Sequence, residues 1–200
     1  MLAGVGIGPG DAELLTLKAI KILEQSAKVY VPGKLAAELI KPYAASEILN
    51  FPMTYNRETL EKHWEENARI IASQAEDRLV SFAVIGDPNF FSTFIHLRRI
   101  ISKQYPEITI TTVPGVSAIT SFAARANAQI DHSFEVTDGS ENKSKIVLKA
   151  VKPRKIAKEL EREGYNEFIY LENLFAEKEH ISTILPEKGS YFSMILARKP

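Results

Sequence analysis

Three short loops carry the residues whose types and spacing best suit ligand binding. They read Gly8-Pro9-Gly10-Asp11, Gly86-Asp87-Pro88 and Pro114-Gly115-Val116-Ser117-Ala118. Each loop follows an apolar or β-branched run and precedes a helical pattern. We therefore expect each at the carboxyl end of a strand, where open α/β sheets bind their ligands. Small residues there let backbone groups approach a ligand closely, and the carboxylates of Asp11 and Asp87 favour a cationic or polyhydroxyl ligand over a polyphosphate.

Residue types that carry covalent or metal chemistry are sparse in this chain. It has no cysteine, no G-x-S-x-G elbow and no Walker A lysine motif. The histidines are scattered without metal-ligand spacing: His63, His96, His132 and His180. This inventory favours a transfer in which a reactive cofactor is positioned beside its acceptor, and it predicts no metal site.

The first glycine cluster does not match the dinucleotide fingerprint G-x-G-x-x-G. The third glycine position is Pro9 when counted from Gly4, and Asp11 when counted from Gly6. A plain strand-to-helix turn is the alternative interpretation of any one of the three loops. That alternative weakens when three such loops occur in one half of the chain.

Composition and charge limit the class of protein. The 200 residues allow one large or two small domains, and 45% of them are hydrophobic. Basic and acidic residues number 25 each, and this zero net charge argues against a general nucleic-acid binder. No apolar run approaches the ~20 residues that span a bilayer, and the N-terminus does not resemble a signal peptide, so we expect a cytoplasmic protein.

Apolar periodicity predicts alternating strands and helices, and therefore a parallel sheet with helices on its faces. Asp11 is the expected N-cap of the first helix and Thr54 that of the third. The expected strands are 2–7, 28–31, 48–53, 82–85, 108–113, 146–150, 168–171 and 191–197. The expected helices are 11–25, 35–40, 58–75, 92–101, 117–126 and 153–163.

These motifs make the chain similar to the tetrapyrrole (corrin/porphyrin) methylases, a family of S-adenosylmethionine-dependent enzymes. The resemblance rests on the three loops and on residues 13–19, which follow the first of them. Within the family, the chain most resembles the C20-methyltransferases of cobalamin biosynthesis, which act on precorrin-2 or cobalt-factor II. The features shared with that subgroup are Phe51-Pro52-Met53-Thr54, Trp64, Ser92-Thr93-Phe94 and Tyr191-Phe192-Ser193.

The resemblance implies an α/β, two-domain tetrapyrrole methylase fold, a homodimer, and S-adenosyl-L-methionine bound in the cleft between the domains. We expect a mainly parallel sheet in an N-terminal domain, 1–114, and a smaller mixed α/β C-terminal domain, 115–200. The implied cofactor-binding residues are Pro9, Gly86, Asp87, Pro88, Ser92, Thr93, Ser117, Ala118, Leu174 and Met194. Those facing the tetrapyrrole would be Gly8, Gly10, Asp11 and Lys34, with Asp11 also a candidate catalytic group.

Such a substrate carries many carboxylates, which basic side chains bind. The candidate clamps are Lys18, Lys34, Arg98, Arg99, Arg125 and Lys149. The chain departs from the subgroup in having Phe91 where relatives often carry tyrosine, and it is short for the subgroup. Alternative functions are methylation at another tetrapyrrole carbon, protein methylation of the diphthine synthase kind, and a non-catalytic nucleotide-binding module.

Overall fold

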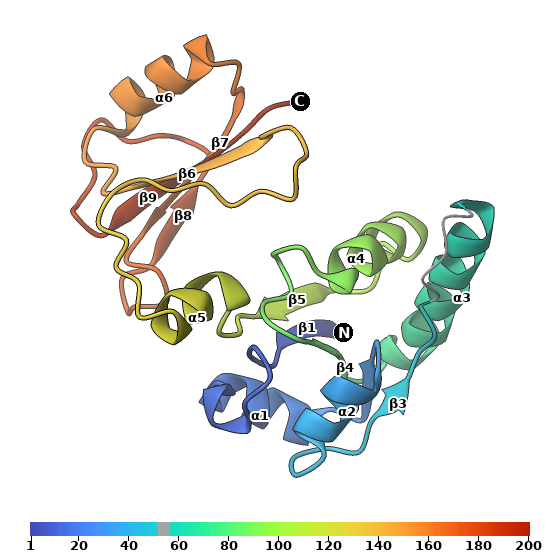
Figure 1. The fold of residues 1–200 in the computed structure, drawn as a ribbon. Coiled ribbons are helices and arrows are strands. Elements are labelled where there is room, and N and C mark those ends of the chain that lie inside the picture. The colour runs from blue at the N-terminus through green and yellow to red at the C-terminus, as the bar shows by residue number, and fades with distance from the viewer. Residues whose placement is uncertain (52–56) are drawn as a thin grey trace. The chain divides into compact units, whose positions relative to one another are not determined.

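The computed structural model describes residues 1–51 and 57–200. Contacts divide the chain into two compact units, Met1–Phe134 and Glu135–Pro200, both drawn in Figure 1. This division falls later than the predicted boundary between residues 114 and 115. The turn after residue 114 is tied to the first unit, because the Gly115 amide donates to Asp87 Oδ2 at 3.1 Å.

A five-stranded sheet forms the centre of the first unit. Its strands are β1 Leu2–Gly6, β2 Lys28–Val31, β3 Glu47–Ile48, β4 Val80–Val84 and β5 Ile110–Val113. They are arranged in the order β3-β2-β4-β1-β5, and every neighbouring pair is parallel. β1 and β4 are buried along their whole length, as apolar strands covered on both faces must be. The parallel sheet predicted from the sequence is confirmed.

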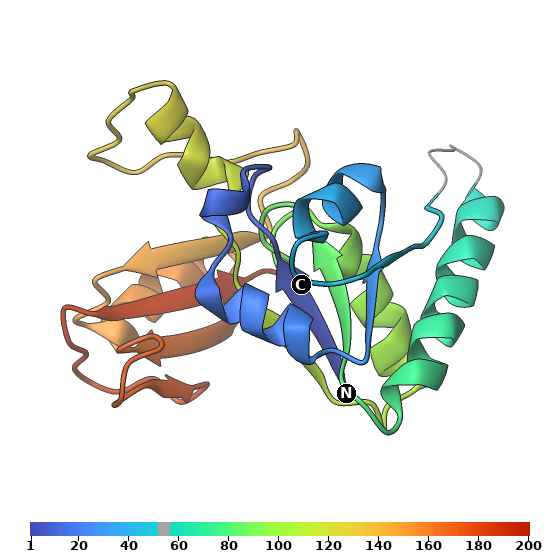
Figure 2. The same cartoon turned by 90° about the horizontal axis from the view of Figure 1, so that it is seen from below.

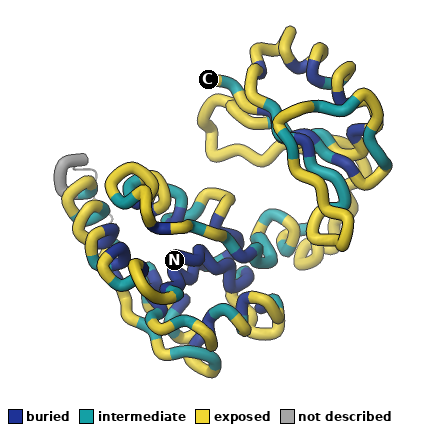
Figure 3. The backbone as a smooth tube through the Cα atoms, turned by 180° about the vertical axis from the view of Figure 1, so that it is seen from behind, coloured by how far each residue is buried: buried dark blue, intermediate teal, exposed yellow. Residues whose placement is uncertain are grey.

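Helices cover both faces of this sheet. They are α1 Leu17–Gln25, α2 Lys34–Ile40, α3 Arg57–Ala75 and α4 Thr93–Gln104, followed along the chain by α5 Ala118–Arg125. α1 and α2 pack on the face that presents Val5 and Val29. α3 and α4 pack on the opposite face, which presents Leu2 and Phe82. Figure 3 shows the buried backbone following the central strands, as expected for a core on each side of the sheet.

The strands β1 and β4 are neighbours, but the chain leaves them toward opposite faces. After β1 it enters α1 on one face, and after β4 it enters α4 on the other. Open α/β sheets bind ligands outside the carboxyl ends of strands at such a topological switch point. The loops after β1 and β4 are two of the three that the sequence singles out.

The first helix begins later than predicted. Asp11 caps only a short 3-10 helix, Ala12–Leu14, by accepting a hydrogen bond from the Glu13 amide. The chain is then extended through Leu15, and the Thr16 side chain caps α1 by accepting from Ala19 N at 3.1 Å. A second capping side chain close behind the first thus interrupts the helical pattern.

The predicted third strand, 48–53, is also shorter in the structure, where β3 comprises Glu47–Ile48. The motif residues Pro52 and Met53, and the predicted cap Thr54, lie outside the described residues. Of the described motif residues, Phe51 and Trp64 pack against each other with ring centroids 4.7 Å apart.

The second unit is an antiparallel sheet with one helix, as Figures 1 and 2 show. Its elements are β6 Ser144–Leu148, α6 Pro153–Arg162, β7 Glu167–Glu172, β8 His180–Ser182 and β9 Ser193–Arg198. The strand order is β6-β9-β7-β8, with every pair antiparallel. α6 covers one face, where Leu160 packs with Ala197 and Ile156 packs with Tyr170 and Ile195. Both units are therefore α/β, as predicted.

Among the described residues, no helix combines the length and the apolar character needed to cross a membrane.

Candidate functional site

The structure brings the three glycine-containing loops of the first unit together at the carboxyl ends of β1, β4 and β5. The Gly86 amide donates to the Gly8 carbonyl oxygen at 2.8 Å, and the two residues form an isolated antiparallel bridge. A methyl carbon in place of the Gly115 hydrogen would lie 2.1 Å from the Gly86 carbonyl oxygen. A methyl carbon at Gly6 would lie 2.5 Å from the Gly115 nitrogen. Only glycine fits these contacts, so the loops meet backbone against backbone.

Asp87 fastens two of these loops to each other. Its side chain is buried, and its Oδ1 accepts a hydrogen bond from Asn89 N at 2.8 Å. Its Oδ2 accepts from Gly115 N at 3.1 Å. Both carboxylate oxygens are thus engaged by backbone amides of the protein. This geometry supports a role for Asp87 in positioning the loops, beside the ligand contact that the sequence resemblance implies.

The segment after Asp87 displays two aromatic rings. Phe90 is 47% exposed and Phe91 65% exposed. Phe91 has φ 49°, a left-handed conformation that costs a non-glycine residue on the order of 1–3 kcal/mol. The predicted cofactor residue Ser92 donates from its Oγ to the Pro88 carbonyl oxygen at 2.6 Å and makes no capping bond to α4. The hydrogen bond from Ser92 thus ties the end of this segment back to its start at Pro88.

The first loop turns through two glycines in left-handed or unusual conformations, Gly8 at φ 76° and Gly10 at φ 130°. Between them lies Pro9, and Asp11 after them is exposed. The carboxylate of Asp11 keeps one oxygen clear of the turn, because the Glu13 amide donates to Oδ1 alone, at 2.9 Å. This carboxylate is the one ionised group that the first loop itself presents.

The third loop and the start of α2 supply the remaining predicted residues of the first unit. Ser117 caps α5 by accepting from Ile119 N at 3.2 Å, and Ala118 is the first residue of that helix. Lys34 is exposed at the first position of α2, directly after the turn that ends β2. These residues lie where the parallel strands end, on the same edge of the sheet as the other two loops.

The six candidate clamps for substrate carboxylates are all exposed, and they are spread over several helices and both units. Lys18 and Lys34 lie in the first turns of α1 and α2, the helices that follow the carboxyl ends of β1 and β2. Arg98 and Arg99 lie further along α4, and Arg125 ends α5. Lys149 belongs to the second unit, where its Nζ lies over the Tyr191 ring, 4.9 Å from the centroid. Lys18 and Lys34 are therefore the clamps best placed near the loops.

In the second unit, the predicted residues Leu174 and Met194 lie at the same end of the sheet. Met194 pairs with Leu148 of β6 and with Leu171 of β7. Leu174 follows the end of β7 by two residues and is 43% exposed. Sequence reasoning missed the hydrogen-bonded groups beneath these residues, which belong to Tyr170, Glu172 and Ser190. A polar residue at the end of an apolar strand was the one available signal.

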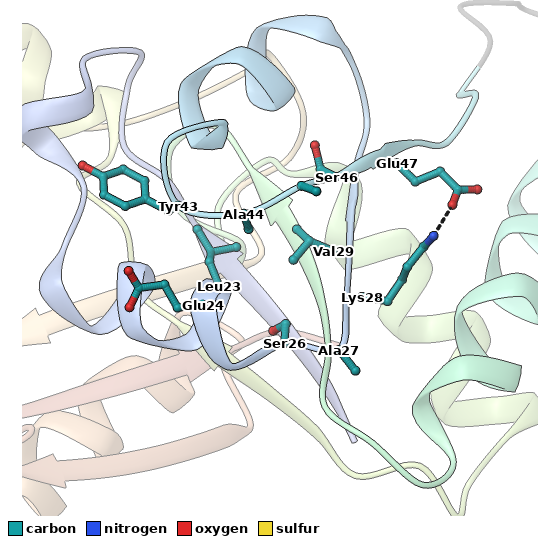
Figure 4. Close-up of a pocket in the computed structure, with 11 residues that line it drawn as sticks. Leu23, Glu24, Ser26, Ala27, Lys28, Val29, Tyr43, Ala44, Ser46 and Glu47 are labelled. Carbon is teal, nitrogen blue, oxygen red and sulfur yellow. Dashed lines mark ion pairs between the residues drawn. The ribbon is translucent and has the colours of Figure 1, made fainter.

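A surface pocket of about 520 Å³ lies at the other edge of the first sheet, around the start of β2 (Figure 4). It is lined by residues of 23–29 and 43–47, among them Lys28 and Glu47, which form an ion pair at 2.6 Å. It contains none of the predicted site residues. Its place at the amino end of β2 separates it from the loops, and parallel α/β sheets bind ligands at the carboxyl ends. The loops are therefore the better candidate for the functional site.

The groups at the loops are suited to binding a ligand and holding it in a fixed orientation. They present backbone groups, the hydroxyls of Thr93 and Ser117, the Asp11 carboxylate and two aromatic rings. Within residues 1–51 and 57–200, no three histidine, aspartate or glutamate side chains lie close enough to hold a metal ion. A doubly wound sheet with glycine loops at its switch point defines a class of α/β proteins that hold a small ligand over that edge.

Comparison with known families identifies the family of α/β proteins to which this chain belongs. Residues 1–182 match the family model of the Tetrapyrrole (Corrin/Porphyrin) Methylases. This chain belongs to that family, as its motifs predicted.

Two curated relatives and one solved structure illustrate the similarity. A probable cobalt-precorrin-2 C(20)-methyltransferase of Methanocaldococcus jannaschii is 39% identical over 133 residues, 62% of this chain and 56% of that protein. The match thus spans little more than half the length of that relative. A probable cobalt-precorrin-7 C(5)-methyltransferase of the same organism is 32% identical over 197 residues, 91% of this chain and 88% of that protein.

The solved structure of the methyltransferase CobJ superposes with a TM-score of 0.53 at 17% identity, over 99% of this chain and 93% of that one. At this identity the superposition shows the fold alone. It agrees with the two-unit α/β architecture described above.

Proposed function

We propose that this protein transfers a methyl group from S-adenosylmethionine to carbon 20 of precorrin-2 or cobalt-factor II, in cobalamin biosynthesis. The observation that carries the proposal is the meeting of three glycine loops at the switch point of a tetrapyrrole methylase sheet. The specific step is supported by the 39% identity to a protein named for it.

The available groups suit such a cofactor. Backbone groups and hydroxyls at the loops match the polar edges of a nucleoside, and exposed rings match its flat base. In our proposal the cofactor contacts Pro9, Gly86, Asp87, Pro88, Ser92, Thr93, Ser117 and Ala118. The sequence resemblance assigns Leu174 and Met194 of the second unit to the same cofactor.

When bound, S-adenosylmethionine supplies an electrophilic methyl group on a positively charged sulfur. Attack by an electron-rich carbon is an in-line displacement, whose rate depends mainly on alignment of the two reactants. The positive charge on sulfur disappears as the methyl group leaves, so a modestly polar site suffices. In our proposal the loops provide that alignment, because backbone contacts between Gly8 and Gly86 and between Gly86 and Gly115 hold them against each other.

The tetrapyrrole contacts in this proposal come from Gly8, Gly10, Asp11 and Lys34. Lys34 would bind a substrate carboxylate, and Lys18, in the first turn of α1, is the second candidate for such a contact. The exposed Asp11 carboxylate is our candidate for accepting the proton that the methylated carbon releases.

The test is a transfer assay with labelled S-adenosylmethionine and either precorrin-2 or cobalt-factor II. We expect a product heavier by one methyl group, labelled at carbon 20 when its position is read by NMR. Titration calorimetry with S-adenosylhomocysteine should show binding in the absence of tetrapyrrole. An unlabelled tetrapyrrole would refute the C20 assignment, and no binding at high micromolar ligand would refute every methylase assignment in favour of a different ligand.

A second candidate is methylation at carbon 5 of a later corrin intermediate. The observation in its favour is the 32% identity to a C(5)-methyltransferase across 91% of this chain. Supplying cobalt-precorrin-7 in the same assay separates the two. Label incorporated there and not into the precorrin-2 substrates would favour this second candidate.

The family resemblance also leads us to propose a homodimer. Light scattering after size-exclusion chromatography should give twice the mass of the chain. A monomeric mass at micromolar concentration would refute the proposed assembly.

A further inference from the structure

Two loops at one end of the second sheet are joined by a single carboxylate, that of Glu172. Glu172 is the last residue of β7. Its Oε2 accepts a hydrogen bond from the Tyr170 hydroxyl at 2.6 Å. Its Oε1 accepts from Ser190 N at 3.2 Å. One side chain thus connects the loop after β7, which it begins, to the loop before β9.

The loop after β7 is held in a strained shape. Asn173 and Phe175 have φ values of 53° and 60°, both left-handed, within three residues of each other. The Phe175 amide donates to Glu179 Oε1 at 2.6 Å, and Asn173 Nδ2 donates to the Lys178 carbonyl oxygen at 3.2 Å. Two strained residues on the order of 1–3 kcal/mol each persist only where surrounding contacts over-determine them. Between them lies Leu174, an apolar side chain presented to the surface.

The loop before β9 packs closely against Tyr170 and Glu172. Ser193 Oγ donates to the Ser190 carbonyl oxygen at 2.6 Å. A methyl carbon at Gly189 would lie 2.6 Å from the Tyr170 hydroxyl oxygen and 2.6 Å from the Ala150 carbonyl oxygen. The loop therefore cannot move closer to the sheet, and its Ser190 amide faces Glu172. Met194 is the second residue of β9, four residues after Ser190.

The ionised form of Glu172 suits a side chain that accepts hydrogen bonds from two different groups. The hydrogen bonds from Ser190, and then the one from Tyr170, hold the pKa of its carboxyl below the ordinary value of 4.5, so it carries its charge at neutral pH. The Tyr170 side chain is fully buried, so its hydroxyl needs a partner and the carboxylate supplies one. Charge-assisted hydrogen bonds are shorter and stronger than neutral ones.

We propose that Glu172 is a positioning residue for cofactor binding: it sets the placement of the loop that carries Leu174 relative to the loop that leads into β9 and its residue Met194. This inference rests on the proposed function, since it concerns the same cofactor. Both carboxylate oxygens of Glu172 accept hydrogen bonds from protein groups, those of Tyr170 and Ser190. Its effect on the reaction is therefore an effect on the cofactor affinity and not on the chemical step.

The experiment compares wild type with Glu172→Gln, Glu172→Ala and Tyr170→Phe. Titration with S-adenosylhomocysteine should give a dissociation constant raised roughly tenfold or more for Glu172→Ala, because two hydrogen bonds to a charged group are lost. Glu172→Gln and Tyr170→Phe should show smaller increases, because each keeps an acceptor for Ser190 N. In the transfer assay, the KM for S-adenosylmethionine should rise while kcat at saturating cofactor is retained.

The matched control is Glu167→Gln, an exposed glutamate at the opposite end of the same strand, which should leave affinity and kinetics unchanged. A merely structural role would lower the active fraction, and hence kcat, with an unchanged KM. If Glu172→Ala fails to fold, Glu172→Gln decides the question by the same two measurements.

The outcomes separate the two proposals. A wild-type protein that binds no S-adenosylhomocysteine overturns the proposed function and this inference with it. A wild type that binds, with Glu172 variants that bind equally well or lose kcat alone, overturns the positioning role and leaves the proposed function standing.

Discussion

Asp87 illustrates how a single residue acts through its neighbours in this protein. Its position after β4 and its negative charge suggest direct contact with a cationic cofactor. In the structure both of its oxygens accept hydrogen bonds from backbone amides, those of Asn89 and Gly115. The carboxylate therefore determines how two loops meet, and any contact with a ligand is made by an already engaged group.

Replacing Asp87 by alanine should weaken the binding of S-adenosylhomocysteine by roughly five- to tenfold or more, because two loop amides lose their acceptor. The fold should survive, with a loss on the order of 1–3 kcal/mol in the free energy of unfolding. Calorimetric titration and urea unfolding measure the two effects, with the exposed Asp77→Ala as the control. An unchanged affinity in the folded variant would contradict both the positioning role and the ligand contact.

Glu172 gives the second sheet a defined pH dependence. Its folded-state pKa lies below the ordinary 4.5 because of the hydrogen bonds from Ser190 and Tyr170. A lowered folded-state pKa contributes stability that is fully present above about pH 4.5 and is lost as the pH falls through the folded-state value. The stability difference between wild type and Glu172→Gln should thus be largest at neutral pH and shrink below pH 4.5. Thermal unfolding of both proteins, measured at intervals of about one pH unit from roughly pH 3 to pH 7, tests this prediction. A stability difference that is the same at every pH would contradict it.

Residues of the site differ in how far the sequence reveals them. Loop glycines and Asp87 follow from local pattern, because small residues after an apolar run are unusual enough to notice. Glu172 does not, because its partner Ser190 lies in a loop 18 residues further along the chain, even though its other partner, Tyr170, is in the same strand. Contacts between segments far apart in the chain leave no local pattern to read.

At the level of elements, the contact between β1 and α4 depends on the absence of a side chain. A methyl carbon at Gly4 would lie 2.3 to 2.6 Å from three carbons of the Phe94 ring, which is itself fully buried. Phe94 also stacks near Phe82, with ring centroids 6.2 Å apart. The central strand therefore admits the helix at this distance only because residue 4 is glycine.

Gly4→Ala should destabilise the first unit by about 1–3 kcal/mol, the usual result of overpacking a core. Combining it with Phe94→Leu should recover part of that loss, although Phe94→Leu alone is destabilising. Urea unfolding of the single and double variants gives the interaction energy between the two sites. Strictly additive losses would contradict the proposed contact.

Most elements of the chain could be predicted from periodicity, and their ends less well. The range of β2 agrees with its prediction because apolar β-branched residues stop at Pro32. The first helix was predicted to start at Asp11, and this was wrong because Thr16 offers α1 a second cap. Asp11 and Thr16 are both good capping residues and are indistinguishable in sequence, and tertiary packing of α1 on the sheet selects between them.

At the level of the whole molecule, the two units are joined by a long exposed stretch. Residues 124–144 are all exposed, and they contain Glu135 and Glu141. Exposed backbone without regular structure is the preferred substrate of proteases.

Limited digestion with a glutamate-specific protease should first cut within 127–143, because local unfolding there costs least. Mass spectrometry of the early products should identify Glu135 or Glu141 as the first site. The control is the equally exposed Glu24 within α1, which should be cut later. Initial cleavage within either sheet would contradict the division into units.

The sheet itself could be predicted as parallel, but not the order of its strands. The order β3-β2-β4-β1-β5 places β4 between two strands that precede it by many residues. A pattern of neighbouring residues in the sequence does not indicate which distant strands will pair. The place of the switch point, and so the meeting of Gly8 with Gly86, emerges only when the strands are assembled.

The close backbone contacts among Gly6, Gly86 and Gly115 have a consequence for protein engineering. The frame that holds these loops is made of main-chain atoms and one carboxylate, so it does not depend on the side chains at Pro9, Phe90 or Phe91. Those side chains are free to vary while the frame stays in register. A library that randomises these three residues and keeps the three glycines and Asp87 should yield folded variants with altered cofactor affinity, so evolvability and structural integrity are assigned to different atoms of the same loops.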